Sequence, residues 1–149
     1  MKSDVNQPVP FPGAEATGND NRNGQIFASA ELSESADLFG LGAGIHVSKE
    51  MHNFGARGVA LFVDTTSATA GTVVAKIQKK DPNSGTWHDL PGAVTASIAD
   101  PADALLTVYP GIAETANVSV SDHLGLIWRV HLTVATAAVT LSVGAVYLR

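Results

Sequence analysis

Histidines are the side chains of this chain most able to bind a metal or move a proton. There are five of them: His46, His52, His88, His123 and His131. The first two are six residues apart across a turn-rich segment, and the next two each adjoin an aspartate. Adjacent residues of a strand point to opposite faces, so these His–Asp neighbours do not converge. We therefore expect solvated or interface histidines and no metal site.

Two further motifs resemble catalytic or nucleotide-binding sequences but lack the required context. Ser121, Asp122 and His123 have the residue types of a hydrolytic triad, yet triad members normally come from separate segments, and no Gly-x-Ser-x-Gly motif occurs. The glycines of residues 40–44 precede an apparent strand, whereas a dinucleotide-binding loop opens a helix. We interpret residues 40–44 as a hinge. The sequence predicts a protein that is not an enzyme and has no cofactor.

The composition limits the class of protein. The chain has 149 residues, which fits one domain, and 45% are hydrophobic, enough for a core. Charged residues make up 15%, against about 25% in an average domain. The net charge of −5 argues against a nucleic-acid partner. Because there are no cysteines, disulfide scaffolds and thiolate metal sites are excluded.

Residues 1–24 differ in composition from the rest. Their prolines are Pro8, Pro10 and Pro12, followed by a run rich in Gly and Asn. Such a segment cannot join a helix or a central strand, and it lacks the apolar region of a signal peptide. Its large apolar side chains are Val5, Val9 and Phe11. We expect an extended arm whose apolar residues bind a neighbouring subunit; a disordered terminus is the alternative.

Residues 25–149 are expected to form one antiparallel β-sandwich, either Ig-like or a jelly roll. Val and Thr make up about a quarter of residues 58–149, and short alternating segments are separated by turn sequences. Residues 130–148 carry no Asp, Glu, Lys or Arg, but their period of two indicates two strands and not a membrane helix. Residues 33–39 have mild helical character but are too short to form a helix that stands alone.

Alternation along residues 128–134 assigns the two faces of one strand. The side chains expected in the core are Trp128, Val130, Leu132 and Val134, packed against Val139, Leu141 and Val143, with Val59, Leu61 and Ile77 completing the layer. Arg129 and His131 lie on the opposite, polar face and are the candidate partner contacts. Trp87 follows a turn, and its alternation does not separate core from surface.

Three segments carry a resemblance to a known family. They read Gly-Val-Ala-Leu-Phe-Val-Asp at 58–64, Lys-Asp-Pro-Asn-Ser-Gly-Thr-Trp at 80–87 and Trp-Arg-Val-His-Leu-Thr-Val at 128–134. With a hairpin expected at the C-terminal end, residues 57–149 resemble the small β-sandwich structural proteins of tailed bacteriophages and prophages, which include head decoration (cement) proteins.

The resemblance implies a protein of the virion, made in the host cytoplasm and bound on the outside of the capsid. The implied partners are the major capsid protein and further copies of this chain, arranged as a trimer, with no nucleic acid and no membrane. An adhesin or carbohydrate-binding module of a tail or head fibre is the alternative. That function would use exposed aromatics, for which only Trp87, Tyr109 and Tyr147 are available.

Overall fold

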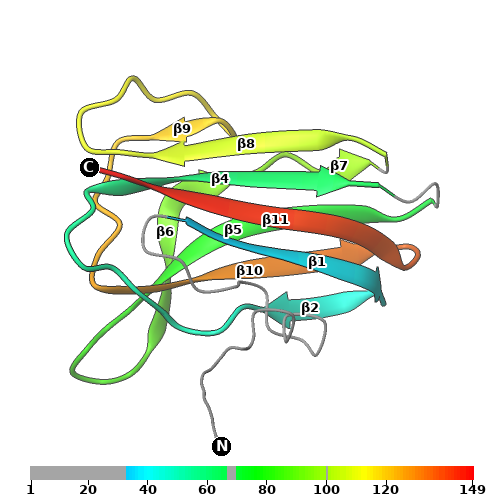
Figure 1. Ribbon diagram of the computed structural model, residues 1–149, viewed down its shortest axis with the longest axis horizontal. Coiled ribbons are helices and arrows are strands. Elements are labelled where there is room, and N and C mark those ends of the chain that lie inside the picture. The colour runs from blue at the N-terminus through cyan, green and yellow to red at the C-terminus, as the bar shows by residue number, and fades with distance from the viewer. Residues whose placement is uncertain (1–32, 67–69, 100) are drawn as a thin grey trace, which may run out of the picture.

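In the described part of the chain, all regular secondary structure is β-strand. The computed structural model describes residues 33–66, 70–99 and 101–149 (Figure 1). The strands are β1 (Ser33–Leu41), β2 (Gly44–Val47), β3 (Met51–His52), β4 (Gly58–Thr65), β5 (Thr72–Lys80), β6 (Trp87–Val94), β7 (Ile98–Ala99), β8 (Asp103–Val108), β9 (Ser119–Val120), β10 (Ile127–Ala135) and β11 (Val139–Leu148). Among these residues, no helix has the length and apolarity needed to cross a membrane.

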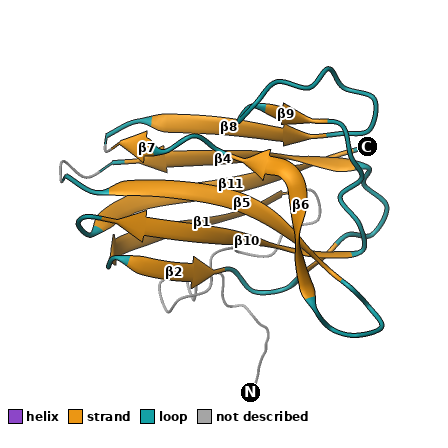
Figure 2. Ribbon diagram, turned by 180° about the vertical axis from the view of Figure 1, so that it is seen from behind, coloured by secondary structure: helices purple, strands orange, loops and turns teal. Residues whose placement is uncertain are grey.

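The strands form two sheets that lie face to face (Figures 1 and 2). The first sheet has the order β1-β11-β4-β8-β9, and the second has the order β2-β10-β5-β6. The short strands β3 and β7 pair with β10 and β5. All pairs are antiparallel except β8 with β9. The expected all-β sandwich is confirmed at this level.

The antiparallel pairs are nested along the sequence. The innermost pair is β5 with β6, which are joined by the short turn at residues 81–86. Outside it, β4 pairs with β8, β2 pairs with β10, and β1 pairs with β11. The pairs β11 with β4 and β10 with β5 then complete the two sheets. The two strands nearest the C-terminal end therefore occupy interior positions, one in each sheet.

The core lies between the sheets and contains all the side chains expected there from alternation. Trp128, Val130 and Leu132 are fully buried on the second sheet, and Leu141 and Val143 are buried on the first. The Trp128 ring meets the Tyr147 ring edge-on, with centroids 5.9 Å apart, so this contact joins the two sheets.

One weak local pattern is overridden by strand pairing, and one expectation about the C-terminal strands was wrong. Residues 33–39 are strand, because their backbone pairs with β11 from Ser33 opposite Val146 to Leu38 opposite Leu141. The two C-terminal strands are not a hairpin: β10 and β11 belong to different sheets. The connection between them includes Thr136, whose φ of 75° is rare outside glycine.

Residues 40–44 carry the chain from the first sheet to the second. Gly40 and Gly44 both have positive φ there, at 62° and 134°, which glycine adopts without strain. The loop connects β1 to β2 and does not precede a helix, as expected. The Nε2 atom of His46 lies 2.8 Å from the carbonyl oxygen of Gly42, so this histidine is bound within its own loop.

Candidate functional site: the charged face of the second sheet

Polar and charged side chains gather on the outer face of the second sheet. Strand pairing sets Arg129 opposite Gln78, His131 opposite Lys76, and Gln78 opposite Asp89. Paired residues of neighbouring strands share a face, and residues two apart along a strand share it too. We call this group the charged face; its members are Lys76, Gln78, Lys80, Trp87, Asp89, Arg129 and His131, on the side of the molecule shown in Figure 2.

Arg129 is the centre of the charged face. Its guanidinium carbon lies 4.2 Å from the centroid of the Trp87 ring, and its Nε donates a hydrogen bond of 2.7 Å to Gln78 Oε1. A cation over an aromatic ring is attracted by the ring quadrupole. Burial lowers the pKa of Arg129 from its usual value, and arginine still remains charged at neutral pH. The side chain is therefore a cation held in one orientation.

A hydrogen-bond network fixes the strand pair beside Arg129. Gln78 Nε2 donates to Asp89 Oδ1 at 2.8 Å, and Lys76 Nζ lies 2.8 Å from Asp89 Oδ2. The hydrogen bond from Gln78 and then that from Lys76 lower the pKa of Asp89, so this carboxylate is ionised at neutral pH. Gln78 thus connects the carboxylate to the guanidinium.

The lysines of this face have carboxylate partners, whereas Arg129 has none among the described residues. Lys80 Nζ lies 2.7 Å from Glu50 Oε2 and 5.6 Å from the Trp87 ring centroid. The hydrogen bond from Lys80 lowers the pKa of Glu50. No described carboxylate forms an ion pair with Arg129. Its Nη atoms are the donors that a carboxylate from outside the chain would use.

His131 is the member of the charged face that adjoins an exposed apolar edge. Its Nδ1 is buried with no hydrogen-bond partner in the described part of the chain. Burial, and then the charge of Lys76, lower the pKa of His131, so the neutral ring is favoured. On the edge strand β2, Val47 is paired with His131 and is 40% exposed, while Ile45 is 66% exposed. This edge adds an apolar margin to the face.

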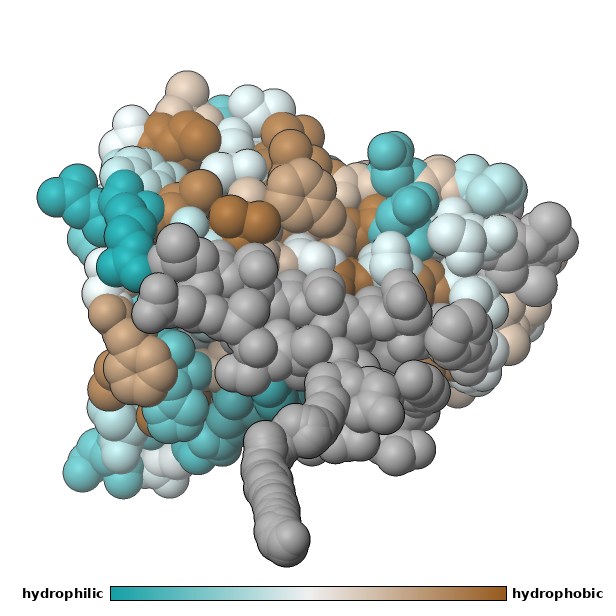
Figure 3. Space-filling model, viewed as in Figure 1, coloured by the Kyte–Doolittle hydropathy of each residue, from teal (hydrophilic) through white to brown (hydrophobic). Residues whose placement is uncertain are grey.

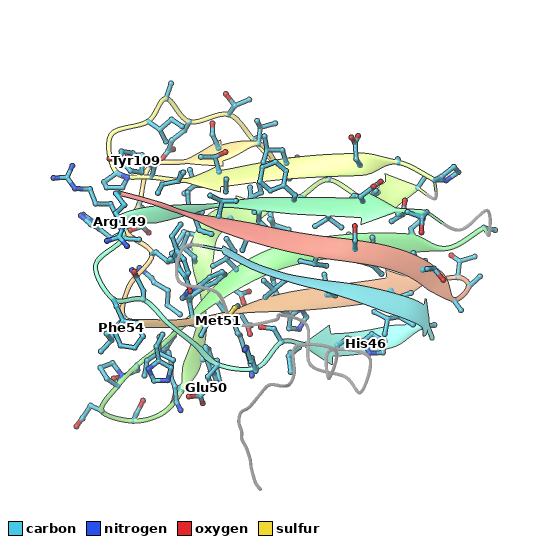
Figure 4. All side chains as sticks on the ribbon, viewed as in Figure 1. His46, Glu50, Met51, Phe54, Tyr109 and Arg149 are labelled. Atoms are coloured by element: carbon cyan, nitrogen blue, oxygen red, sulfur yellow. The ribbon has the colours of Figure 1, made fainter. Side chains whose placement is uncertain are left out.

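A second exposed apolar group lies at one end of the sandwich and contains Phe54, one of the aromatics that could line a carbohydrate-binding face. Phe54 is 87% exposed and stacks on His52, with ring centroids 6.1 Å apart (Figure 4). Asn53 holds this loop: its Nδ2 donates to the carbonyl oxygens of Ala56 and Gly125, and its Oδ1 accepts from the Ala56 N–H.

The structure does not bring the other candidate catalytic and metal-binding residues together in a site. Ser121 Oγ accepts the N–H of Gly111, while Asp122 Oδ1 accepts the N–H of His123 and lies 3.7 Å from Lys79 Nζ. These bonds do not arrange Ser121, Asp122 and His123 as a triad. In the described ranges, no group of three or more His, Asp or Glu residues is placed to hold a metal ion.

Of the predicted contact residues, Arg129 and His131 lie together on the outer face of β10, whereas Val5, Val9 and Phe11 lie outside the described residues. The three aromatics considered for carbohydrate binding are apart. Trp87 is on the second sheet, Tyr109 follows β8, and Tyr147 packs against Trp128 in the core. Comparisons of the chain with protein-family models, curated proteins and solved structures find no match.

Proposed function

We propose that this protein is a capsid decoration protein of a tailed bacteriophage, which binds the outer face of the major capsid lattice and stabilises the head. The proposal rests on the resemblance carried by residues 58–64, 80–87 and 128–134. It makes the protein a non-enzymatic binding module of the virion. The partners are the major capsid protein and neighbouring copies, with the three-fold arrangement as the expected stoichiometry.

The strand order supports a jelly roll rather than an Ig-like sandwich. Leaving out the two-residue strands, eight strands remain, and they pair in the nested order first with last, second with seventh, third with sixth and fourth with fifth. That order arises when one long antiparallel ribbon is rolled into two sheets. Jelly rolls occur in viral capsid proteins and in lectins, so the fold is compatible with the proposal.

The structural observation that supports a binding role for the charged face is the oriented Arg129 side chain. Held by Gln78 and by the Trp87 ring, it loses little conformational freedom when it binds a carboxylate. Arginine and tryptophan are also the side chains that most often dominate interface energies. We infer that the capsid partner presents an aspartate or glutamate to Arg129, with apolar side chains against Ile45 and Val47. Residues 1–24, with Val5, Val9 and Phe11, provide a second attachment.

The test is attachment to heads of the encoding phage prepared without this protein. We expect Arg129→Ala to weaken binding by about ten- to a hundred-fold, the range for losing one buried charge-assisted contact of about 1.5–3 kcal/mol. Thermal melting verifies that the isolated variant is folded, because the truncation also removes the hydrogen bond to Gln78 and the contact with the Trp87 ring. Binding is measured by co-sedimentation of the protein with the heads.

Thr133→Ala is the matched control, because Thr133 is exposed on the same face of the same strand. It should bind heads as the unchanged protein does. Equal binding by the Arg129→Ala protein would remove this face from the attachment site. Failure of the unchanged protein to bind heads at all would reject the decoration role.

The adhesin alternative has weaker support from the geometry. Sugar binding needs an exposed aromatic face, and the Arg129 guanidinium already lies over the Trp87 ring. Tyr109 is half-buried, and its hydroxyl donates to the carbonyl oxygen of Arg149. Specific binding to a glycan array that is lost in Trp87→Ala would favour the adhesin.

A further inference from the structure

The outer face of the first sheet has a charge pattern that is complementary to itself. Its apolar centre consists of Phe62, Leu105 and Val146, which are 47%, 45% and 41% exposed. Phe62 is paired directly with Leu105, and Val146 is paired with Ala60, the next outward residue of β4. Figure 3 shows this apolar area over β11, β4 and β8, with hydrophilic residues at both ends of it.

The charges at the two ends have opposite signs. At one end, Asp64 and Asp103 are exposed and directly opposite each other in the pairing of β4 with β8. At the other end, Arg57 and Arg149 are exposed, where the N–H of Arg57 donates to the carbonyl oxygen of Leu148. Figure 4 shows Arg149 beside Tyr109 at that end. We call these pairs the acidic end and the basic end.

None of these four charged side chains has an ion-pair partner in the described part of the chain. Like charges directly opposite each other on neighbouring strands destabilise a sheet. The pairing of Asp64 with Asp103 is therefore a local cost to the isolated molecule. An arginine supplied by a second molecule would remove that cost.

We propose that this face binds the same face of a second copy of the chain around a two-fold axis. The axis lies in the plane between the two facing sheets, passes over the apolar centre and runs perpendicular to the strands. The rotation places the acidic end of each copy over the basic end of the other, so both oppositely charged contacts form at once. The two apolar centres meet each other. An interface of this kind is isologous and closes at two subunits.

The size of the face predicts that the dimer is weak. From Arg57 to Asp64 the strand spans roughly 23 Å, and three strands span roughly 14 Å, at about 3.3 Å per residue and 4.8 Å per strand spacing. The resulting area of roughly 300–400 Å² per copy is well below the ~800 Å² of a standard interface. We therefore expect dissociation constants of roughly 0.1–1 mM in solution. Attachment of many copies to one particle would raise their effective concentration.

The inference does not depend on the capsid role, because it uses a different face and is tested on the isolated protein. Sedimentation equilibrium of the full chain up to about 1 mM should fit a monomer–dimer equilibrium. Phe62→Ser should weaken dimerisation at least ten-fold. The control is Ile45→Ser, which removes an even more exposed apolar side chain from the other sheet and should leave dimerisation unchanged. Thermal melting verifies that both variants are folded.

A charge exchange tests the two-fold geometry itself. One variant carries Asp64→Lys and Asp103→Lys, and the other carries Arg57→Glu and Arg149→Glu. Each variant alone should be monomeric, because both ends of the face then carry the same sign. Mixed together they should form a heterodimer, since both contacts are again attractive. A chain that stays monomeric, a trimer as the associated species, or a mixture that does not associate would each overturn the proposal.

Discussion

At the scale of single residues, alternation along β10 places neighbouring side chains on opposite faces of the second sheet. Trp128, Val130 and Leu132 fill the core, while Arg129 and His131 lie on the charged face. Both assignments follow from the period of two, which is a local property of the sequence. Alternation cannot predict which residues of other strands each side chain contacts. Trp87 and Asp89 reach Arg129 and Gln78 only because β6 pairs with β5.

Trp128→Ala should lower the free energy of unfolding by about 3–5 kcal/mol, the usual range for truncating a buried aromatic side chain. The cost arises because Trp128 is fully buried and contacts Tyr147 on the opposite sheet. Urea unfolding measures the change. Leu126→Ala is the control: Leu126 is only two residues away but 59% exposed, and its loss should cost far less. Equal effects in the two variants would contradict the assigned core.

The stability of the protein should fall as the pH is lowered from 7.5 to 5.5, in part through His131. Burial and the Lys76 charge lower the pKa of His131 in the folded state from 6.5, while Asp89 acts in the opposite direction. The unfolded chain then takes up the proton more readily, so protonation favours unfolding. This contribution is fully present above pH 6.5 and is lost as the pH falls through the folded-state pKa.

Urea unfolding at the two pH values measures this dependence in the unchanged protein and in His131→Gln. The variant should show a smaller loss of stability on acidification. His88→Gln, which removes an exposed histidine from the neighbouring strand β6, should retain the full loss. If all three proteins lose the same amount, His131 is not the group responsible.

At the scale of elements, the pairing of β4 with β8 depends on a residue without a side chain. A Cβ atom at Gly58 would lie 1.9 Å from the carbonyl oxygen of Val108. The two strands would have to separate to admit it, which weakens the first sheet at the end nearest Arg57. The sequence does not reveal this requirement, because Gly58 only begins a strand pattern and its neighbour Val108 is far away in the chain.

Gly58→Ala should destabilise the protein by about 1–3 kcal/mol, the cost of overpacking a tightly packed site, or by more if β8 detaches. Gly42→Ala provides the comparison, since no atom lies within 4 Å of a Cβ built there. That variant should melt at nearly the same temperature as the unchanged protein. Melting curves followed by circular dichroism distinguish the two cases, and a neutral Gly58→Ala would show that the strands can adjust freely.

The type of an element could be predicted where a local sequence pattern determines it. The prediction failed where pairing with a distant strand determines the element type. Residues 58–65 and 72–80 alternate strongly, and both are strands. Residues 33–39 have a weak pattern of their own, and pairing with β11 makes them a strand. The short strand β9 was missed, because two residues carry no periodicity. The assignment of β10 and β11 to different sheets depends on contacts distant in sequence, which no local pattern encodes.

At the scale of the whole molecule, the sandwich presents two outer faces of different chemistry on opposite sides. The second sheet has the fixed cation Arg129 within a network of paired charges. The first sheet has an apolar centre between ends of opposite charge. The sheets are rigidly joined through the buried core between them. A single chain can thus bind one partner on each side without the two contacts competing for the same residues.

The nested pairing also implies an order of folding. The innermost hairpin, β5 with β6, closes a loop of only a few residues, and every pair outside it must close a longer one. Loop closure costs more entropy as the loop lengthens, unless an inner pair has already brought the ends together. Folding then proceeds like a zipper from the turn at residues 81–86 outward, and β1 joins β11 last. During synthesis β1 emerges early but finds its partner only when β11 has left the ribosome, so the completion of the first sheet is a late event in folding.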